Sequence, residues 1–196
     1  MSKNQRKRGH AKPMPGGQSG QEPVGLDTNA APLAGVFADV LEANAAFSVQ
    51  DGFDELTGRA ARGLAVLTCM DSRIIPLAML GLEPGDAKVL RNAGARVTDD
   101  VLRTLVLATY LLDVNRVMVI AHTDCRMADC VETDVHNAIH DAGGPDTRSI
   151  SFLTTDDQRQ TLLDDVQRIR SWPYLGNVNV GGFLCDTPHA KLTQVC

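Results

Sequence analysis

Three short apolar runs, each followed by a segment with helical character, constrain the fold of this chain more than any other feature. The runs cover residues 64–68, 87–90 and 116–121. Short runs rich in Val, Ile and Leu are typical of strands buried on both faces of a parallel sheet. Their alternation with helices indicates βαβ units. We therefore predict a single α/β domain with a mainly parallel sheet flanked by helices.

Cap and turn residues indicate where the helices begin and end. Thr98 is predicted to cap a helix that runs to about residue 112, with two acidic residues in its first turn. Thr155 and Gln158 fit a capping box in front of a helix that runs from about residue 156 to residue 170. The remaining predicted elements are a helix opened by Pro32, a short helix from Pro76 to Gly81, and a last strand over residues 178–186.

The helix opened by Pro32 carries apolar residues on one face only. A single amphipathic helix in front of the main body must bury this face against another surface, and a second subunit is one candidate. The residues of this face are Leu33, Val36, Phe37, Val40 and Leu41.

Charge divides the chain into two parts. Residues 1–30 carry five basic and two acidic side chains, whereas the rest of the chain carries 14 basic and 22 acidic ones. Residues 14–25 form a Gly/Pro/Gln run without periodicity, so we predict a flexible basic tail over residues 1–31 and a folded domain over residues 32–196. The acidic domain argues against nucleic-acid binding, because it repels phosphate.

Hydropathy and cysteine content indicate the compartment. No apolar run is long enough to span a membrane, and the N-terminus lacks the apolar stretch of a secretory signal. Five cysteines, an odd number, favour a reducing compartment in which thiols bind metal or take part in chemistry. We therefore expect a cytoplasmic protein.

Residues able to bind a metal ion follow two of the predicted strands. Cys69, Asp71 and Arg73 come directly after the first strand, and His122 and Cys125 come after the third. Ligands of open parallel sheets bind beyond the carboxyl ends of the strands. Two thiolates and one imidazole suit zinc, and a catalytic zinc commonly has three protein ligands and one open position. Arg73 can pair with Asp71 through a fork of N–H donors.

Other cysteine and histidine residues fit such a site less well. Cys130 follows Cys125 closely and could compete as a ligand, but a buried thiol without a role is the better interpretation. His136 and His140 stand four apart on a predicted helix, but residue 137 is Asn, so the His-Glu-x-x-His pattern of metalloproteases is absent. We predict that these two histidines lie on a solvated helix face. Cys185 and Cys196 have no partner motif.

The sequence resembles the β-class carbonic anhydrases, particularly their short form. The resemblance covers about residues 33–196 and follows the order of the family motifs. The paired Cys-x-Asp-x-Arg and His-x-x-Cys motifs are specific together, although either alone would be weak evidence. The matching segments are Cys69-Met-Asp-Ser-Arg73, Arg91-Asn-Ala-Gly94, Val97-Thr-Asp-Asp100, His122-Thr-Asp-Cys125, Gly182-Phe-Leu and Lys191-Leu-Thr.

This resemblance implies a lyase that reversibly hydrates carbon dioxide to bicarbonate and a proton. It implies Zn²⁺ held by Cys69, His122 and Cys125, and a dyad of Asp71 and Arg73 in which Asp71 is the fourth ligand when the site is closed. Zinc supplies a Lewis acid that makes water reactive near neutral pH. The resemblance also implies a homodimer or a dimer of dimers, in which the N-terminal helix lies across the partner.

The chain departs from the family pattern at two positions near this site. Arg126 stands where Gly is usual after the second zinc cysteine, and Ala95 stands where Gly often follows Asn-Ala-Gly. Ala95 is a small change unless the backbone there needs a positive φ. Arg126 could turn outward, bind bicarbonate or narrow the pocket. We expect substrate contacts at Gly94, Ala95 and Arg126.

Two other functions are consistent with the same residues. The zinc site could hydrolyse CS2 or COS, a chemistry found on this scaffold. Alternatively, a closed structural zinc could serve a catalytically weak assembly protein, for which Arg126 is the best support.

Overall fold

The computed structural model describes residues 35–48 and 52–196, and the chain divides into two compact units, residues 1–51 and 52–196. The predicted tail over residues 1–31 and the predicted helix start at Pro32 lie outside the described residues. In the first unit, helix α2 (Ala38–Phe47) contains no buried residue. Large apolar side chains on this helix and just before it are more than half exposed, namely Val36, Phe37, Val40 and Leu41.

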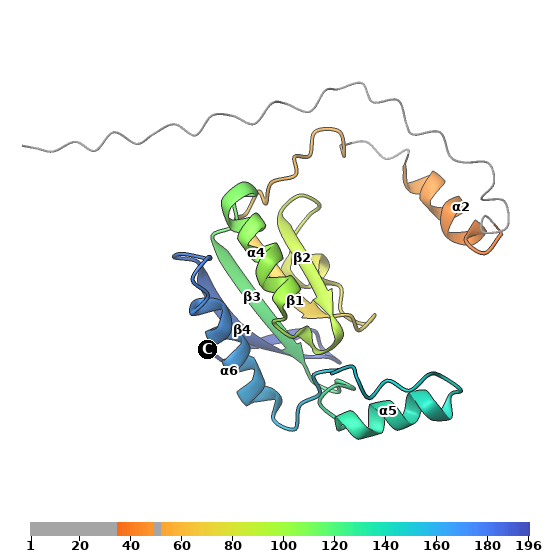
Figure 1. The fold of residues 1–196 in the computed structure, drawn as a ribbon. Helices are drawn as coiled ribbons and strands as arrows, with labels where there is room; N and C mark the ends of the chain where they lie inside the picture. Colours follow the sequence, from red (N-terminus) through yellow and green to blue (C-terminus); the bar gives the residue numbers. More distant parts are fainter. Residues whose placement is uncertain (1–34, 49–51) are drawn as a thin grey trace, which may run out of the picture. The chain divides into compact units, whose positions relative to one another are not determined.

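The second unit is built on a five-stranded sheet in the order β2-β1-β3-β4-β5 (Figure 1). The first four strands in this order are parallel, and the last is antiparallel to its neighbour. The predicted α/β fold with a mainly parallel sheet is confirmed. The strands are β1 (Leu64–Cys69), β2 (Ala87–Asn92), β3 (Arg116–His122), β4 (Asn179–Asp186) and β5 (Lys191–Gln194).

Strand β5 was not predicted from the sequence, where the last predicted strand covers residues 178–186. Its four residues are mostly exposed and contain no apolar run. The strand forms because it can pair with β4, where Leu192 lies opposite Cys185. Such pairing is a property of the tertiary structure and leaves little local signal.

Helices α4 (Asp99–Leu111) and α6 (Gln158–Arg170) cover one face of the sheet (Figure 1). The Thr98 hydroxyl accepts a hydrogen bond from the N–H of Val101, so the predicted cap of α4 is confirmed. The predicted capping box of α6 is wrong. Asp157 caps this helix by accepting from the N–H of Gln160 at 2.9 Å, because its carboxylate lies next to the first turn.

Helix α5 (Glu132–Asp141) has no buried residue and carries the two histidines predicted to be solvated. His140 is exposed, but His136 is not. The Nδ1 atom of His136 lies 3.0 Å from the Thr147 hydroxyl, and its ring packs against Phe152 with the centroids 5.3 Å apart. The prediction of a solvated face therefore holds for His140 and is wrong for His136, which the following loop covers.

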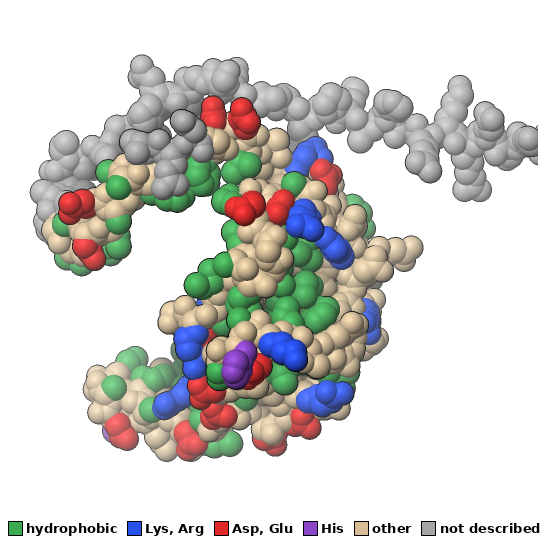
Figure 2. Space-filling view, turned by 180° about the vertical axis from the view of Figure 1, so that it is seen from behind, with side chains coloured by type: hydrophobic (Ala, Val, Ile, Leu, Met, Phe, Trp, Pro, Cys, Tyr) green, Lys and Arg blue, Asp and Glu red, His purple; other side chains and the backbone are tan. Residues whose placement is uncertain are grey.

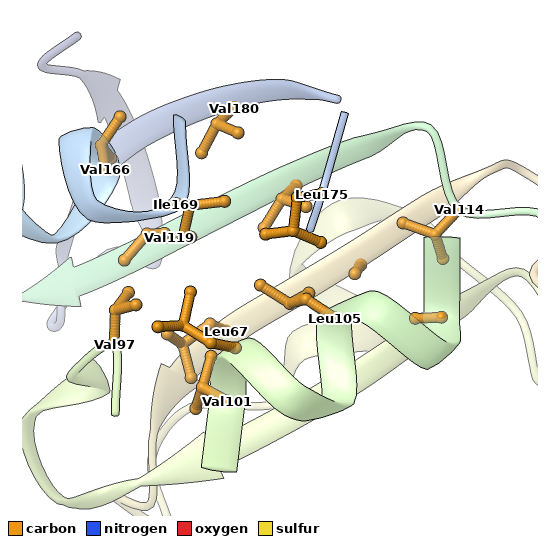
Figure 3. Packing of buried hydrophobic residues seen from close by; sticks show 14 of the residues in the cluster. Leu67, Val97, Val101, Leu105, Val114, Val119, Val166, Ile169, Leu175 and Val180 are labelled. Carbon is orange, nitrogen blue, oxygen red and sulfur yellow. The ribbon is translucent and has the colours of Figure 1, made fainter. Parts of the chain in front are cut away.

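The main core lies between the sheet and helices α4 and α6 (Figure 3). All six residues of β1 are buried, as expected for a strand covered on both faces. The opposite face has a smaller core and the short helix α3 (Pro76–Leu80). Figure 2 shows hydrophobic side chains gathered on the side of the molecule opposite to the view of Figure 1. Partly buried side chains on the opposite face include Met118, Phe183 and Leu192.

No helix within residues 35–48 and 52–196 has both the length and the apolar character that crossing a membrane requires.

Candidate metal centre

The carboxyl ends of β1 and β3 bring three of the predicted ligands together. Cys69 is the last residue of β1, His122 is the last residue of β3, and Cys125 lies in the turn that follows. Because these two strands are parallel neighbours, both end at the same edge of the sheet. The two sulfur atoms and a ring nitrogen of His122 all lie within 4.8 Å of one another, and each residue is at most 5% exposed.

The His122 ring is oriented so that one nitrogen is free for a metal ion. Its Nδ1 atom lies 2.9 Å from the backbone oxygen of Thr123, which can only accept, so Nδ1 carries the proton. The Thr187 hydroxyl, 3.3 Å from Nδ1, donates to the same oxygen at 2.6 Å. Nε2 is then an unprotonated acceptor. It is buried and has no hydrogen-bond partner among the described residues, which is costly unless a ligand satisfies it.

The two thiols form a coupled pair whose charge a cation would stabilise. A hydrogen bond from Cys125 lowers the pKa of Cys69, while burial opposes the shift. The same contact, together with burial, raises the pKa of Cys125. Without a cation, the pair thus favours one thiolate and one thiol. Two sulfur donors and one imidazole nitrogen at this spacing fit Zn²⁺, which would allow both thiols to ionise.

Asp71 and Arg73 form a tight ion pair beside the three ligands. The Arg73 Nε and Nη2 atoms donate to the two carboxylate oxygens at 3.0 and 2.7 Å, and the Arg73 backbone N–H donates to Oδ1 at 2.9 Å. These bonds hold the pKa of Asp71 well below its usual range. Arg73 also donates to the Asp124 carboxylate at 2.5 Å. Asp71 therefore has the paired arrangement, in which its oxygens are engaged by Arg73.

An open pocket of about 640 Å³ leads to this cluster. Its lining combines the three ligands and the Asp71–Arg73 pair with apolar side chains. The other lining residues are Met70, Ser72, Ala93, Arg126 and Met127.

The predicted substrate contacts fall into two places. Arg126 lines the open pocket, whereas Gly94 and Ala95 line a separate small cavity of about 10 Å³ that also touches Cys125. The N–H of Gly94 lies 3.4 Å from the Cys69 sulfur, so this residue contacts a ligand directly. Ala95 has a φ of 57°, so the backbone here does need the left-handed region in which Gly is unstrained.

Several residues that support the centre were not identified from the sequence. Gln158 donates to the backbone oxygen of His122 at 3.0 Å, and Thr187 fixes the oxygen that orients the ring. Arg96 donates to Asp165 on α6 at 2.8 Å and thereby ties the turn that contains Gly94 to that helix. These partners lie 36 to 69 residues apart in the sequence, so no local motif marks them.

Comparisons with known proteins agree with this geometry. A family model described as carbonic anhydrase matches residues 64–151. The β-carbonic anhydrase 1 of Mycobacterium tuberculosis is 35% identical over 139 residues, covering 69% of this chain and 83% of the relative. The carbon disulfide hydrolase of Saccharolobus solfataricus is 42% identical over 82 residues, covering 42% of this chain and 40% of the relative. A crystal structure of carbonic anhydrase from Streptococcus mutans superposes with a TM-score of 0.76 at 30% identity, covering 82% of this chain and 97% of that one.

Proposed function

The chain belongs to the β-class carbonic anhydrases, and we propose that it hydrates carbon dioxide at a zinc ion held by Cys69, His122 and Cys125. The observation that carries the assignment of the site is the His122 Nε2 atom, which is buried, has no hydrogen-bond partner in the part of the chain that the structure describes, and lies close to two buried thiols. When bound, zinc supplies a Lewis acid that makes a water molecule reactive near neutral pH.

The Asp71–Arg73 pair is proposed to keep the reacting position available. Arg73 engages both carboxylate oxygens of Asp71, so this carboxylate is held away from the role of a ligand. Because the pKa of Asp71 is low, it stays ionised and can accept a hydrogen bond from water in the pocket. If Arg73 released it, Asp71 would become the fourth donor to the metal, and the site would close.

The remaining pocket lining suits a small neutral substrate. Met70, Ala93 and Met127 provide an apolar path to the ligand cluster. Carbon dioxide has no charge and gains little from polar contacts in its ground state. Arg126 adds one positive charge to this lining. Gly94 and Ala95 act behind the ligands, where the Gly94 N–H stabilises negative charge on the Cys69 sulfur.

A stopped-flow assay of carbon dioxide hydration, run together with a zinc determination, tests this proposal. We expect about one zinc per chain and rapid hydration that a chelator abolishes. The Cys69→Ser variant should lose both zinc and activity, whereas Cys196→Ser is a matched control because Cys196 does not belong to the cluster. Stoichiometric zinc without hydration at any pH up to about 9 would contradict the proposal and favour an assembly protein.

Hydrolysis of CS2 is the second candidate, favoured by the similarity to the carbon disulfide hydrolase. The same pocket would take CS2, which is also linear and neutral. Sulfide release from CS2 or COS, compared with hydration of carbon dioxide by the same preparation, separates the two activities. Sulfide release that exceeds hydration would overturn the assignment to carbon dioxide.

We propose that the protein assembles as a homodimer or a dimer of dimers in which α2 packs on a partner copy. Helix α2 buries none of its residues, and the sheet face around Phe183 is only partly covered. The Val40→Asp/Leu41→Asp variant should therefore reduce the mass measured by light scattering. An unchanged mass would contradict this role of α2. A cytoplasmic location is proposed because the buried thiols of the metal centre need a reducing compartment.

A further inference from the structure

The two arginines of the metal pocket differ in how many of their donors are used. Arg73 donates to the Asp71 carboxylate, to the Asp124 carboxylate and to the backbone oxygen of Asp124. Arg126 lines the same pocket, next to the ligand Cys125, and among the described residues it has no side-chain hydrogen bond or ion pair. Its guanidinium group is therefore the available positive group of this pocket.

The charges of the pocket lining leave Arg126 as the positive group that would attract an anion. Asp71 and Arg73 neutralise each other, and two thiolates would neutralise a zinc ion. Arg126 then leaves the pocket with one net positive charge. A neighbouring pocket of about 520 Å³ shares Arg126 but also contains Asp124, Asp129 and Asp134, which disfavour an anion there.

Hydrogen bonds of the surrounding turn fix the backbone position of Arg126. The backbone oxygen of Cys125 accepts from the N–H groups of Ala128 and Asp129 at 2.8 and 3.1 Å, and the oxygen of Arg126 accepts from the Cys130 thiol at 2.9 Å. The turn that holds a metal ligand thus also holds Arg126 at the pocket wall. The side chain of Arg126 is exposed and can change its conformation, but its backbone is held beside the reacting position.

We propose that Arg126 is a binding residue for the planar anionic product, bicarbonate, and for small anions of the same shape. A guanidinium fork matches a planar oxyanion with two parallel hydrogen bonds, whereas neutral carbon dioxide gains little from it. Arg126 therefore distinguishes product from substrate. This inference rests on the proposed function, since bicarbonate is the product of that reaction.

Nitrate provides a direct test, because it is planar and singly charged and is not a substrate. Calorimetric titration of the zinc-loaded protein with nitrate should give a dissociation constant about tenfold higher for Arg126→Ala than for the unchanged protein. Arg126→Lys should fall between the two, since it keeps the charge but loses the fork. Arg159→Ala removes an exposed arginine outside this pocket and should leave nitrate binding unchanged.

Kinetics provide the second readout. Inhibition of hydration by bicarbonate should weaken about tenfold in Arg126→Ala and should stay unchanged in the control Arg159→Ala, because the lost contact belongs to the bound product. Equal nitrate binding by the unchanged protein and by Arg126→Ala would overturn the proposal and indicate that the anion binds at the metal instead. A loss of kcat/KM with unchanged nitrate binding would also overturn it. If the unchanged protein did not hydrate carbon dioxide, the proposed function would fail, while the nitrate titration would still decide the anion site.

Discussion

Arg96 and Asp165 form an ion pair behind the metal centre, and breaking it from one side is expected to destabilise the fold strongly. The Arg96 Nε atom lies 2.8 Å from Oδ2 of Asp165, and the two side chains are only 20% and 7% exposed. Arg96 also donates to the backbone oxygen of Leu153 at 2.8 Å. The pair joins the turn that contains Gly94 to helix α6 and the loop before it.

Removing one partner leaves the other charge buried without compensation, which typically costs about 3–5 kcal/mol. Because Arg96 keeps some contact with solvent, we expect the lower end, about 3 kcal/mol, for both Arg96→Met and Asp165→Leu. The double variant removes both charges together. It should cost no more than about 3 kcal/mol, rather than the sum of about 6 kcal/mol expected for independent sites.

Urea unfolding at constant protein concentration and under reducing conditions measures these differences. With a slope of about 2 kcal/mol per molar urea, each single variant should lower the midpoint by about 1.5 M. Arg103→Met is the matched control, because the Arg103–Asp100 pair is exposed and should contribute less than about 0.5 kcal/mol. A double variant destabilised by the full sum of the single effects would refute the reasoning, as would single variants no worse than the control.

Three further predictions concern the metal centre. Thr187→Val removes the hydroxyl beside His122 Nδ1 and should weaken zinc affinity about tenfold in a chelator competition, whereas unchanged affinity would exclude this supporting role. Cys125→Ser should reduce bound zinc to well below one per chain by elemental analysis, and full occupancy would remove Cys125 from the ligand set. Arg73→Ala should lower stability at pH 7. Because Arg73 lowers the pKa of Asp71 in the folded state, this difference should begin to shrink as the pH falls below about 4, the unfolded-state pKa, and should be lost only as the pH falls through the lower folded-state pKa. Urea unfolding should therefore give a smaller difference at pH 3 than at pH 7, and equal differences would contradict the prediction.

Much of the fold follows from local pattern in the sequence. Strands β1, β2 and β3 appear as short apolar runs because they are buried, and Thr98 marks the start of α4 because its side chain satisfies a free N–H group. The juxtaposition of Cys69 with His122 also follows, since parallel neighbouring strands end at one edge of a sheet.

Other features depend on contacts between distant segments. Asp157 rather than Thr155 caps α6, because the geometry of the preceding loop decides which side chain reaches the first turn. His136 is covered by a loop that carries Thr147, although its own helix looks solvated in sequence. The positive φ of Ala95 follows from the path of its turn and not from the residue type.

The sequence by itself determined which ligand groups are present, since two thiols, an imidazole and a carboxylate–arginine pair lie at or just after the ends of predicted strands. Only the tertiary structure decided how these groups are held. The fold orients the free Nε2 atom of His122 toward the thiols, because Thr187 lies beside Nδ1 on the other side of the ring. It also brings Arg73 into a hydrogen bond with Asp71. It also leaves Arg126 unpaired among the described residues that line the pocket. Donor chemistry belongs to single residues, whereas orientation and pairing depend on partners that the folded chain brings together from far along the sequence.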